Sequence, residues 1–482
     1  MRGGSLAVLR ERLAEHGQEH VLRFWDQLDS VEQEALSGQI ESIDFGLMER
    51  LIDALVLRDP PEEQFDDIRP VPLIPKPVRG AGDADAAWEA GEEALRGGRV
   101  GLFLVAGGQG TRLGFDGPKG TYPIGPVSKR TLFEFHAEKI RNLQRRYGCV
   151  LPWYIMVSDA NEAATRAFFE ANAYLGLDSA NVLFVRQRMM PSVDVEGRFL
   201  LDAPGHIVMN PNGHGGSIPA MVDGGVLADA RRRGVDLISY FQVDNWAVKV
   251  ADPYALGYHV LRGAEMSSKN QEKNEARENV GVHCLCDGEY RVIEYTELER
   301  FPALLKEDGE GGLVFSAGNP AIHVLSADFV ERVYRQYDEF PWHRAHKRVL
   351  YLNADGVLVE PEKPNAYKFE TFVFDALRYV RHDPVALEID RPGEYTPIKT
   401  YDEGPNSVVH AWRTMREYWA QWFEAAGCAV PRDGDGTVTV EVEVSPAFAY
   451  SLEEFIERTA GWDWPGEGDL AIGPEGEWIV AH

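Results

Sequence analysis

One glycine-rich segment combines the residue types that bind phosphate. Residues 107–120 read GGQGTRLGFDGPKG and include Arg112 and Lys119. Glycines lack a Cβ atom, so their backbone can approach a ligand closely and direct N–H groups at phosphate oxygens. Arg112 and Lys119 add positive charge to the same loop. The segment therefore predicts a phosphate-binding loop.

This loop does not match the two commonest phosphate-binding motifs. A Walker A motif needs Gly-Lys followed by Ser or Thr, whereas Lys119 precedes Gly120 here. A dinucleotide fingerprint needs G-x-G-x-x-G, and Gly108, Gly110 and Gly114 leave a longer last interval. The glycines alone would also suit a structural turn, so further residues are needed to decide the chemistry.

Asp244 is a candidate magnesium ligand. It directly follows the apolar run 237–243, as the glycine-rich loop follows the apolar run 100–106. A carboxylate at the C-terminal end of a strand can hold Mg²⁺ between itself and substrate phosphates. The alternative is an aspartate that caps a turn.

The surrounding pattern predicts the elements that position these residues. The apolar runs 100–106, 153–157, 182–185 and 237–243 are typical of buried parallel strands, and helical patterns separate them. Strands alternating with helices predict a doubly wound, Rossmann-like α/β core. Ligands bind at the C-terminal ends of the strands in such sheets, where the glycine-rich loop and Asp244 both lie.

Three regions are expected along the chain. Residues 1–75 begin with a helical region, residues 76–395 form the central α/β domain, and residues 396–482 form a small C-terminal domain. Within the central domain, whose sheet is expected to be mixed, Asp287-Gly288 separates two β-rich runs and predicts a hairpin, with an antiparallel accessory sheet beside the parallel one. The alternating valines of 438–444 predict a strand in the C-terminal domain.

Composition excludes several classes of protein. The 482 residues carry a formal net charge of −28, which would repel nucleic acid and anionic lipid. No run approaches the 18 or so apolar residues of a membrane span, and no secretory signal is visible. Four cysteines are too few and too scattered for a disulfide framework. We therefore expect a cytoplasmic protein with no membrane or nucleic-acid partner.

The complete string G-G-x-G-T-R-L-G…P-K-G resembles the signature of sugar nucleotidyltransferases. Further blocks, in order along nearly the whole chain, resemble the eukaryotic-type UDP-N-acetylhexosamine pyrophosphorylases of the UDP-sugar pyrophosphorylase family. These blocks are residues 17–25, 243–245, 292–295, 317–319, 363–365 and 444–446. The resemblance implies an enzyme that joins UTP to a sugar 1-phosphate, N-acetylglucosamine 1-phosphate being expected, with Mg²⁺ (or Mn²⁺), and releases a UDP-sugar and pyrophosphate.

The resemblance also implies roles for individual residues. The nucleotide would be bound by Ala106, Gly107, Gly108, Gln187, Gly213 and Asp244, and Asp244 would also hold the metal. Arg112 and Lys119 would stabilise the leaving pyrophosphate, and Lys399 the attacking phosphate and the α-phosphate. The sugar would be bound by His214, Glu294, Asn319, Asn365, Phe372 and Phe374. Phe372 suits a buried core position equally well.

His214 departs from the pattern of the N-acetylhexosamine enzymes, which usually carry Asn there. The Gly-His-Gly order resembles the UDP-glucose and broad UDP-sugar pyrophosphorylases, so one alternative is such an enzyme. A second alternative is a non-catalytic UDP-sugar binding protein, although Arg112, Lys119, Asp244 and Lys399 are all present. A glycosyltransferase would usually show a D-x-D metal motif, which 243–245 is not. The sequence leaves the oligomeric state open.

Overall fold

The computed structural model describes residues 6–58, 63–309, 311–464 and 468–479. They form two compact units, each made of three chain segments. The first unit takes the described residues of Met1–Gln64, Gln187–Ile218 and Arg335–Ala376; the second takes those of Phe65–Arg186, Pro219–Tyr334 and Leu377–His482. The three-part division expected from the sequence stays a prediction.

The described residues of the second unit contain a 12-stranded sheet. Its main path runs β1-β12-β14-β11-β15-β10-β3-β4-β5, with β13 paired to β12 and β20 joining β11 to β2. The strands are β1 (Ile68–Pro70), β2 (Leu73–Ile74), β3 (Val100–Val105), β4 (Trp153–Val157), β5 (Val182–Arg186), β10 (Leu237–Gln242), β11 (Met266–Glu272), β12 (Gly281–Cys286), β13 (Glu289–Ile293), β14 (Ala317–Asn319), β15 (His323–Ser326) and β20 (Val385–Glu388).

Four parallel strands form the part of this sheet that matters for phosphate binding. β3, β4 and β5 follow one another across the sheet, and the chain then returns to place β10 on the other side of β3. This reversal of strand order is a topological switch point, where open α/β sheets bind ligands. β15 pairs antiparallel with β10 and makes the sheet mixed. The predicted doubly wound α/β fold is confirmed.

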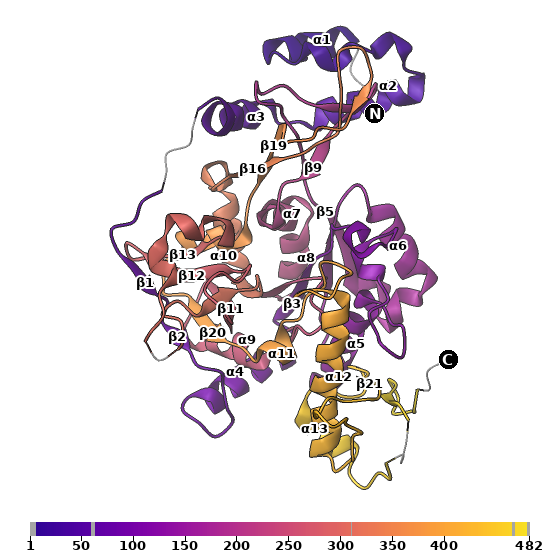
Figure 1. Ribbon diagram of the computed structural model, residues 1–482, viewed down its shortest axis with the longest axis vertical. Helices are drawn as coiled ribbons and strands as arrows, with labels where there is room; N and C mark the ends of the chain where they lie inside the picture. The colour runs from indigo at the N-terminus through magenta and orange to yellow at the C-terminus, as the bar shows by residue number, and fades with distance from the viewer. Residues whose placement is uncertain (1–5, 59–62, 310, 465–467, 480–482) are drawn as a thin grey trace. The chain divides into compact units, whose positions relative to one another are not determined.

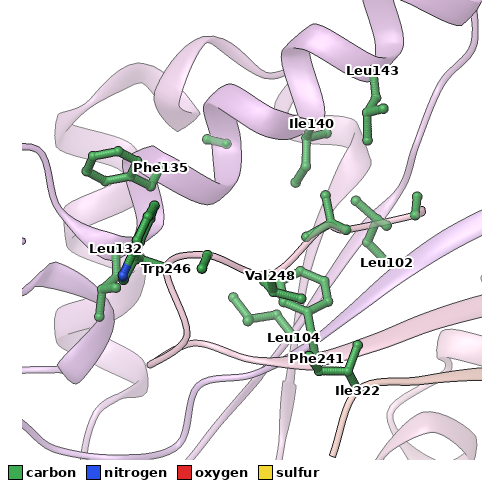
Figure 2. Close-up of a cluster of buried hydrophobic side chains, with 14 of the residues drawn as sticks. Leu102, Leu104, Leu132, Phe135, Ile140, Leu143, Phe241, Trp246, Val248 and Ile322 are labelled. Carbon is green, nitrogen blue, oxygen red and sulfur yellow. The ribbon is translucent and has the colours of Figure 1, made fainter. Parts of the chain in front are cut away.

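Helices of the second unit supply the other side of its core. They are α4 (Ala84–Arg96), α5 (Leu132–Tyr147), α6 (Glu162–Ala171), α8 (Val226–Arg233), α9 (Pro253–Leu261), α10 (Ala327–Tyr334), α11 (Arg391–Glu394), α12 (Val408–Ala425) and α13 (Leu452–Arg458), while α7 (Ser217–Asp223) enters from the first unit. A capping box between Thr131 and Glu134 starts α5 as predicted. Figure 2 shows side chains of α5, such as Phe135 and Ile140, on one side of a cluster that also holds Leu104 and Phe241 of β3 and β10.

Two local predictions have different outcomes. The Asp287-Gly288 hairpin is confirmed: both residues have positive φ, 50° and 85°, and join β12 to β13. In the C-terminal part of the chain, drawn in orange to yellow in Figure 1, the strand predicted over 438–444 is limited to β21 (Val442–Val444), which pairs with β22 (Leu470–Ile472). Val438 instead bridges Arg432 in a separate turn.

The first unit is built from N-terminal helices and short antiparallel strand pairs. The predicted N-terminal helical region is confirmed as α1 (Leu6–Glu15), α2 (Ser30–Ser42) and α3 (Phe45–Ile52). The strand pairs are β6 (Met189–Pro191) with β9 (Met209–Pro211), β7 (Leu201–Ala203) with β8 (His206–Ile207), β16 (His343–Lys347) with β19 (Ala366–Glu370), and β17 (Tyr351–Leu352) with β18 (Leu358–Val359). Leu36, Phe199 and Phe369 are among the residues of their shared apolar core.

Two observations bear on the environment of the protein. Across the described ranges, no helix has the length and apolar character needed to cross a membrane. None of the four cysteines, Cys149, Cys284, Cys286 and Cys428, forms a disulfide within the described ranges.

Candidate active site

The glycine-rich loop after β3 folds back on itself beside Lys119. The N–H of Lys119 donates to the carbonyl of Gly108 (3.0 Å), and that of Gly110 to the carbonyl of Gly117 (2.9 Å). A Cβ atom on Gly110 would lie 2.8 Å from the ring of Phe115, so this fold-back requires glycine. Gly108 is exposed, and the methylene next to the Lys119 ammonium passes beside it.

Two side chains after the neighbouring strand β4 hold the carbonyl groups of this loop. Ser158 Oγ donates to the carbonyl of Gly107 (2.8 Å). Asn161 Nδ2 donates to the carbonyls of Ala106 (2.8 Å) and Gly108 (3.2 Å). None of the hydrogen bonds within the described ranges uses the N–H of Gly107 or Gly108. The carbonyl groups of residues 106–108 therefore have donors, and the N–H groups of Gly107 and Gly108 are available for an anion, the arrangement of an anion-binding nest.

Lys119 and Asp244 form an ion pair at the switch point. The parallel register of β3 and β10 pairs Val105 with Gln242, so the loops that follow the two strands leave the sheet side by side. Lys119 Nζ lies 3.2 Å from Asp244 Oδ2, and the two side chains keep only 18% and 13% of their exposure. Partial burial weakens solvent screening, which makes charge at this position more effective than on an open surface.

Helix α5 supports the loop that carries Asp244. His136 Nε2 lies 3.2 Å from the carbonyl oxygen of Val243, and Lys139 Nζ donates to the carbonyls of Trp246 and Val248. Burial, with a smaller effect of Lys139, lowers the pKa of His136 to about 3, so its ring is neutral near pH 7. Figure 2 shows Trp246 and Val248 within the apolar cluster beneath α5.

The segment that carries Lys399 is attached to the same loop. The N–H of Ile398 donates to the carbonyl of Asp244 (2.9 Å), and the N–H of Lys399 donates to the carbonyl of Asn406 (2.7 Å). Lys399 is exposed. Arg112 is also exposed, on the short 3-10 turn Thr111–Leu113 within the glycine-rich loop. The structure thus brings Lys119, Asp244 and the Lys399 backbone together.

Glu294 and Asn319 lie close together on the second unit's sheet. Gly281 of β12 is paired with Asn319 of β14, and a Cβ on Gly281 would lie 3.4 Å from Glu294 Oε1. Asn319 Oδ1 accepts from the N–H of Ala321 (2.9 Å). Its Nδ2 is buried and makes no hydrogen bond within the described ranges. A buried donor without a partner is costly, which suits an atom that meets a ligand.

The hydroxyl of Tyr395 is influenced by the charges of both Asp244 and Glu294. Burial raises the pKa of its hydroxyl well above the usual value, and the negative charge of Asp244 raises it further, with a smaller effect of Glu294. The phenol therefore stays protonated and can donate a hydrogen bond. The sequence prediction did not include Tyr395, Ser158 or Asn161. Their positions directly after a strand or before Lys399 are the signal that could have found them.

In the first unit, Gln187, Gly213 and His214 surround one loop. Gln187 Nε2 donates to the carbonyl of Gly213 (2.6 Å), which leaves Oε1 to accept from a base. Gly213 has φ +78°, and a Cβ there would lie 2.3 Å from the carbonyl oxygen of Thr371. The N–H of Gly215 donates to that same oxygen (2.8 Å). Only glycine allows this close approach.

The tautomer of His214 is set by the backbone. The N–H of Val373 donates to His214 Nδ1 (3.1 Å), so a neutral ring carries its proton on Nε2. The His214 ring centroid lies 5.2 Å from that of Phe372 and 5.4 Å from that of Phe374. Phe374 is buried, whereas Phe372 is half-buried. The structure therefore brings together a donor and two aromatic rings, all predicted to contact the sugar.

Asn365 uses its side chain within the first unit. Its Oδ1 accepts from the N–H of Val349 (2.8 Å) and its Nδ2 donates to the carbonyl of Val349 (3.0 Å). Both amide atoms thus hold the backbone of a neighbouring segment, which gives Asn365 a structural task besides its predicted sugar contact.

A metal at Asp244 would need oxygen ligands from a substrate. Within the ranges that the structure describes, no group of three or more His, Cys, Asp or Glu side chains could hold a metal ion. Asp244 supplies one carboxylate. Mg²⁺ commonly uses one or two carboxylates together with substrate phosphates and water, so Asp244 beside a phosphate-binding loop fits this ion.

Comparisons with known proteins show what the whole chain is similar to. The family model described as UTP–glucose-1-phosphate uridylyltransferase matches residues 78–417. The UDP-N-acetylhexosamine pyrophosphorylase-like protein 1 of Xenopus tropicalis is 36% identical over 480 residues, covering 93% of each chain. The UDP-N-acetylglucosamine pyrophosphorylase of Saccharomyces cerevisiae is 33% identical, covering 93% of this chain and 96% of that one. The crystal structure of the uridine diphosphate N-acetylglucosamine pyrophosphorylase from Trypanosoma brucei, 24% identical, shares the fold over 98% of this chain and 100% of that chain, with a TM-score of 0.82.

Proposed function

The chain belongs to the UTP–glucose-1-phosphate uridylyltransferase family, and we propose that it makes a UDP-sugar and pyrophosphate from UTP and a sugar 1-phosphate. N-Acetylglucosamine 1-phosphate is the proposed sugar substrate, since relatives at 33–36% identity over most of the chain carry N-acetylhexosamine or N-acetylglucosamine pyrophosphorylase names. The family resemblance predicted from the sequence is thereby confirmed.

The observation that carries the proposal is the arrangement around Asp244. The Lys119 ammonium lies 3.2 Å from its carboxylate, and the backbone next to Lys399 is bonded to its carbonyl. A reaction between phosphates requires groups that bind phosphate and neutralise its charge. The glycine-rich loop, the Asp244 carboxylate and the segments that carry Lys119 and Lys399 provide such groups at one edge of the sheet.

The reaction needs charge stabilisation more than acid–base catalysis. A sugar 1-phosphate is ionised at neutral pH, so its oxygen can attack the α-phosphorus of UTP without a general base. A new P–O bond forms there as the bond to the β-phosphate breaks, and pyrophosphate carries the electrons away. Lys119 and Arg112 would stabilise the leaving pyrophosphate, and Lys399 the attacking phosphate and the α-phosphate.

We propose Mg²⁺ as the cofactor, held by Asp244 together with the UTP phosphates, and Mn²⁺ as a substitute. When bound, the ion would supply charge neutralisation and hold the phosphates in one geometry. His214, Glu294, Asn319, Asn365, Phe372 and Phe374 are proposed to contact the sugar, and Gln187 and Gly213 the uracil. Charge and cysteine state support the remaining proposals. The net charge of −28 opposes nucleic acid and anionic lipid as partners, and four cysteines outside disulfides suit the reducing cytoplasm.

A pyrophosphate-release assay tests the proposal. The purified chain is given UTP, Mg²⁺ and, separately, the 1-phosphates of N-acetylglucosamine, N-acetylgalactosamine and glucose. Pyrophosphate release should be fastest with N-acetylglucosamine 1-phosphate and absent without a sugar phosphate. UDP-sugar binding without pyrophosphate release from any mixture would instead indicate a non-catalytic binding protein. A preference for glucose 1-phosphate would indicate a UDP-glucose or broad UDP-sugar pyrophosphorylase.

A further inference from the structure

Asn245 joins two segments that both carry proposed site residues. It follows Asp244 directly and is buried to 3% exposure. Its Nδ2 donates to the carbonyl of Glu394 (2.7 Å), and its Oδ1 accepts from the N–H of Thr396 (3.0 Å). One amide side chain therefore pairs with the backbone on both sides of Tyr395, as a neighbouring strand would.

The same contact continues through the backbone toward Lys399. Asn245 forms an antiparallel bridge with Pro397, and the N–H of Ile398 donates to the carbonyl of Asp244 (2.9 Å). Lys399 is the next residue. The chain direction of 394–399 beside Asp244 is thus set by three hydrogen bonds, two of which belong to the Asn245 side chain.

A buried ion cluster fixes the start of this segment. Lys269, from the central strand β11, donates to the carboxylate of Glu394, and its Nζ lies 2.7 Å from Asp252 Oδ2. Lys249 Nζ lies 3.3 Å from the other oxygen of Glu394. The side chains of Lys269, Glu394 and Asp252 keep 3%, 7% and 8% of their exposure. Glu394 is therefore held by its side chain in the core and by its carbonyl at Asn245.

We propose that Asn245 is the positioning residue that sets the place of the Lys399 ammonium relative to the Asp244 carboxylate. This inference rests on the proposed function. Lys399 itself is exposed and directly follows Ile398, which is buried in the core, so the reach of its ammonium depends on the backbone that precedes it. A displacement of about 1 Å in a catalytic group can lower a rate by about 10²-fold, so a single buried amide can matter here without touching the substrate.

A double-mutant cycle on kcat/KM tests the inference. Asn245→Ala should lower kcat/KM by about 10- to 100-fold in the wild-type background. In a Lys399→Ala background the same change should cost less than about 3-fold, because the group that Asn245 positions is already gone. Asn245→Asp, which keeps the acceptor for Thr396 but places a second acceptor against the carbonyl of Glu394, should show the same pattern. If Asn245→Ala lowers kcat/KM by the same factor in both backgrounds, or if neither Asn245 variant lowers kcat/KM, the inference is wrong.

Amide hydrogen exchange supplies a readout independent of turnover. The segment 394–400 should lose protection in Asn245→Ala, since the N–H groups of Thr396 and Ile398 are held by residues 244 and 245. Asn142→Ala is the matched control: Asn142 is also fully buried and ties α5 to Glu454, away from Lys399. It should leave both the 394–400 exchange and the response to Lys399→Ala unchanged. Unchanged exchange of 394–400 in Asn245→Ala would contradict the inference.

The proposed function and this inference fail in different ways. If the wild-type chain releases no pyrophosphate with any sugar phosphate, the proposed function is wrong, and the same cycle measured on the Kd of UTP then decides the role of Asn245. If the wild type is active but Asn245 and Lys399 act independently, only the inference is wrong.

Discussion

Lys119 Nζ lies 3.2 Å from Asp244 Oδ2, and this ion pair joins the loops that follow two neighbouring parallel strands, β3 and β10. The pair places a cation and an anion at the point where the strand order reverses. A nucleotide bound there would meet a lysine that can hold phosphate and a carboxylate that can hold a metal.

Removing either lysine should slow the reaction without unfolding the protein. Lys119→Ala or Lys399→Ala should lower kcat by about 10²-fold or more, because each removes positive charge that stabilises the transition state. Lys129→Ala is the control, since Lys129 is exposed and donates to the carbonyl of Pro126 in a neighbouring loop. The prediction is checked by measuring steady-state rates of the three variants, with circular dichroism to confirm that each is folded. A near-wild-type rate would remove that lysine from the mechanism.

Metal dependence should be traced to Asp244. EDTA should abolish activity and Mg²⁺ or Mn²⁺ should restore it, while Asp244→Asn should need about 10-fold more Mg²⁺ or fail to recover. Asp236→Asn is a matched control at the opposite end of β10, where Asp236 pairs with Arg99 (2.6 Å) on the surface. Titrating Mg²⁺ into each EDTA-treated variant gives the comparison. An unchanged metal requirement in Asp244→Asn would place the ligand elsewhere.

The glycine-rich loop should depend on Asn161. Asn161→Ala removes the donor to the carbonyls of Ala106 and Gly108, so the loop N–H groups should lose their fixed direction and the KM for UTP should rise about 10-fold. Asn172, at the other end of α6, donates to the carbonyl of Phe168 and is exposed. Asn172→Ala should therefore leave the KM for UTP unchanged. Equal effects of the two substitutions would argue for a general role of helix α6.

Buried histidines should make the protein sensitive to mild acid. Burial lowers the pKa of His283 from 6.5 to about 4. Between pH 6.5 and pH 4, this histidine is therefore protonated in the unfolded chain but neutral in the folded chain. Stability is then retained at pH 7 and lost as the pH falls below 6.5, by about 2 kcal/mol at pH 5 for this residue. His283→Gln should lose less stability than the wild type between pH 7 and pH 5. Urea denaturation at both pH values, with the exposed His206→Gln as control, measures the difference.

Apolar patterning explains how much of this molecule could be predicted. β3 and β10 are buried on both faces and are mostly apolar, so the residues at their ends could be placed at one sheet edge from the sequence. The central strand β11, Met266–Glu272, has the sequence MSSKNQE and is nearly all buried. Its Lys269 is paired with two carboxylates, and its Asn270 with His283. No local pattern indicates a buried polar strand, because its partners are distant in the chain.

The same limit applies to the candidate site. Lys119 and Asp244 can be predicted because Lys119 lies in the glycine-rich loop that follows one apolar run and Asp244 directly follows another. Asn161 and Asn245 act through backbone carbonyl and N–H groups of other segments, and an asparagine after a strand is usually only a turn residue. Their tasks become visible only when the positions of 106–108 and 394–396 are known.

The preference of the enzyme for one sugar 1-phosphate over another should depend on His214. Its Nδ1 accepts from the Val373 N–H, so a neutral ring carries its proton on Nε2, and the ring centroids of Phe372 and Phe374 lie 5.2 and 5.4 Å from that of His214. We expect N-acetylglucosamine 1-phosphate to be the best substrate and glucose 1-phosphate a real but weaker one. His214→Asn should lower kcat/KM for glucose 1-phosphate about 10-fold more than for the N-acetyl sugar. Both sugars carry the hydroxyl that the ring would bond, but glucose lacks the acetyl contact that would compensate for its loss.

The measurement is kcat/KM for both sugars on wild type, His214→Asn and His206→Asn. His206 is an exposed histidine of the same unit whose Nδ1 lies 2.6 Å from Asp202 Oδ1, so its substitution should change neither value. Phe374→Ala should separate the acetyl contact from the hydroxyl contact, because it should weaken the N-acetyl sugar selectively. If wild type instead prefers glucose 1-phosphate, the aromatic pair around His214 does not receive an acetyl group, and the Gly-His-Gly order of the loop is the better guide to the substrate.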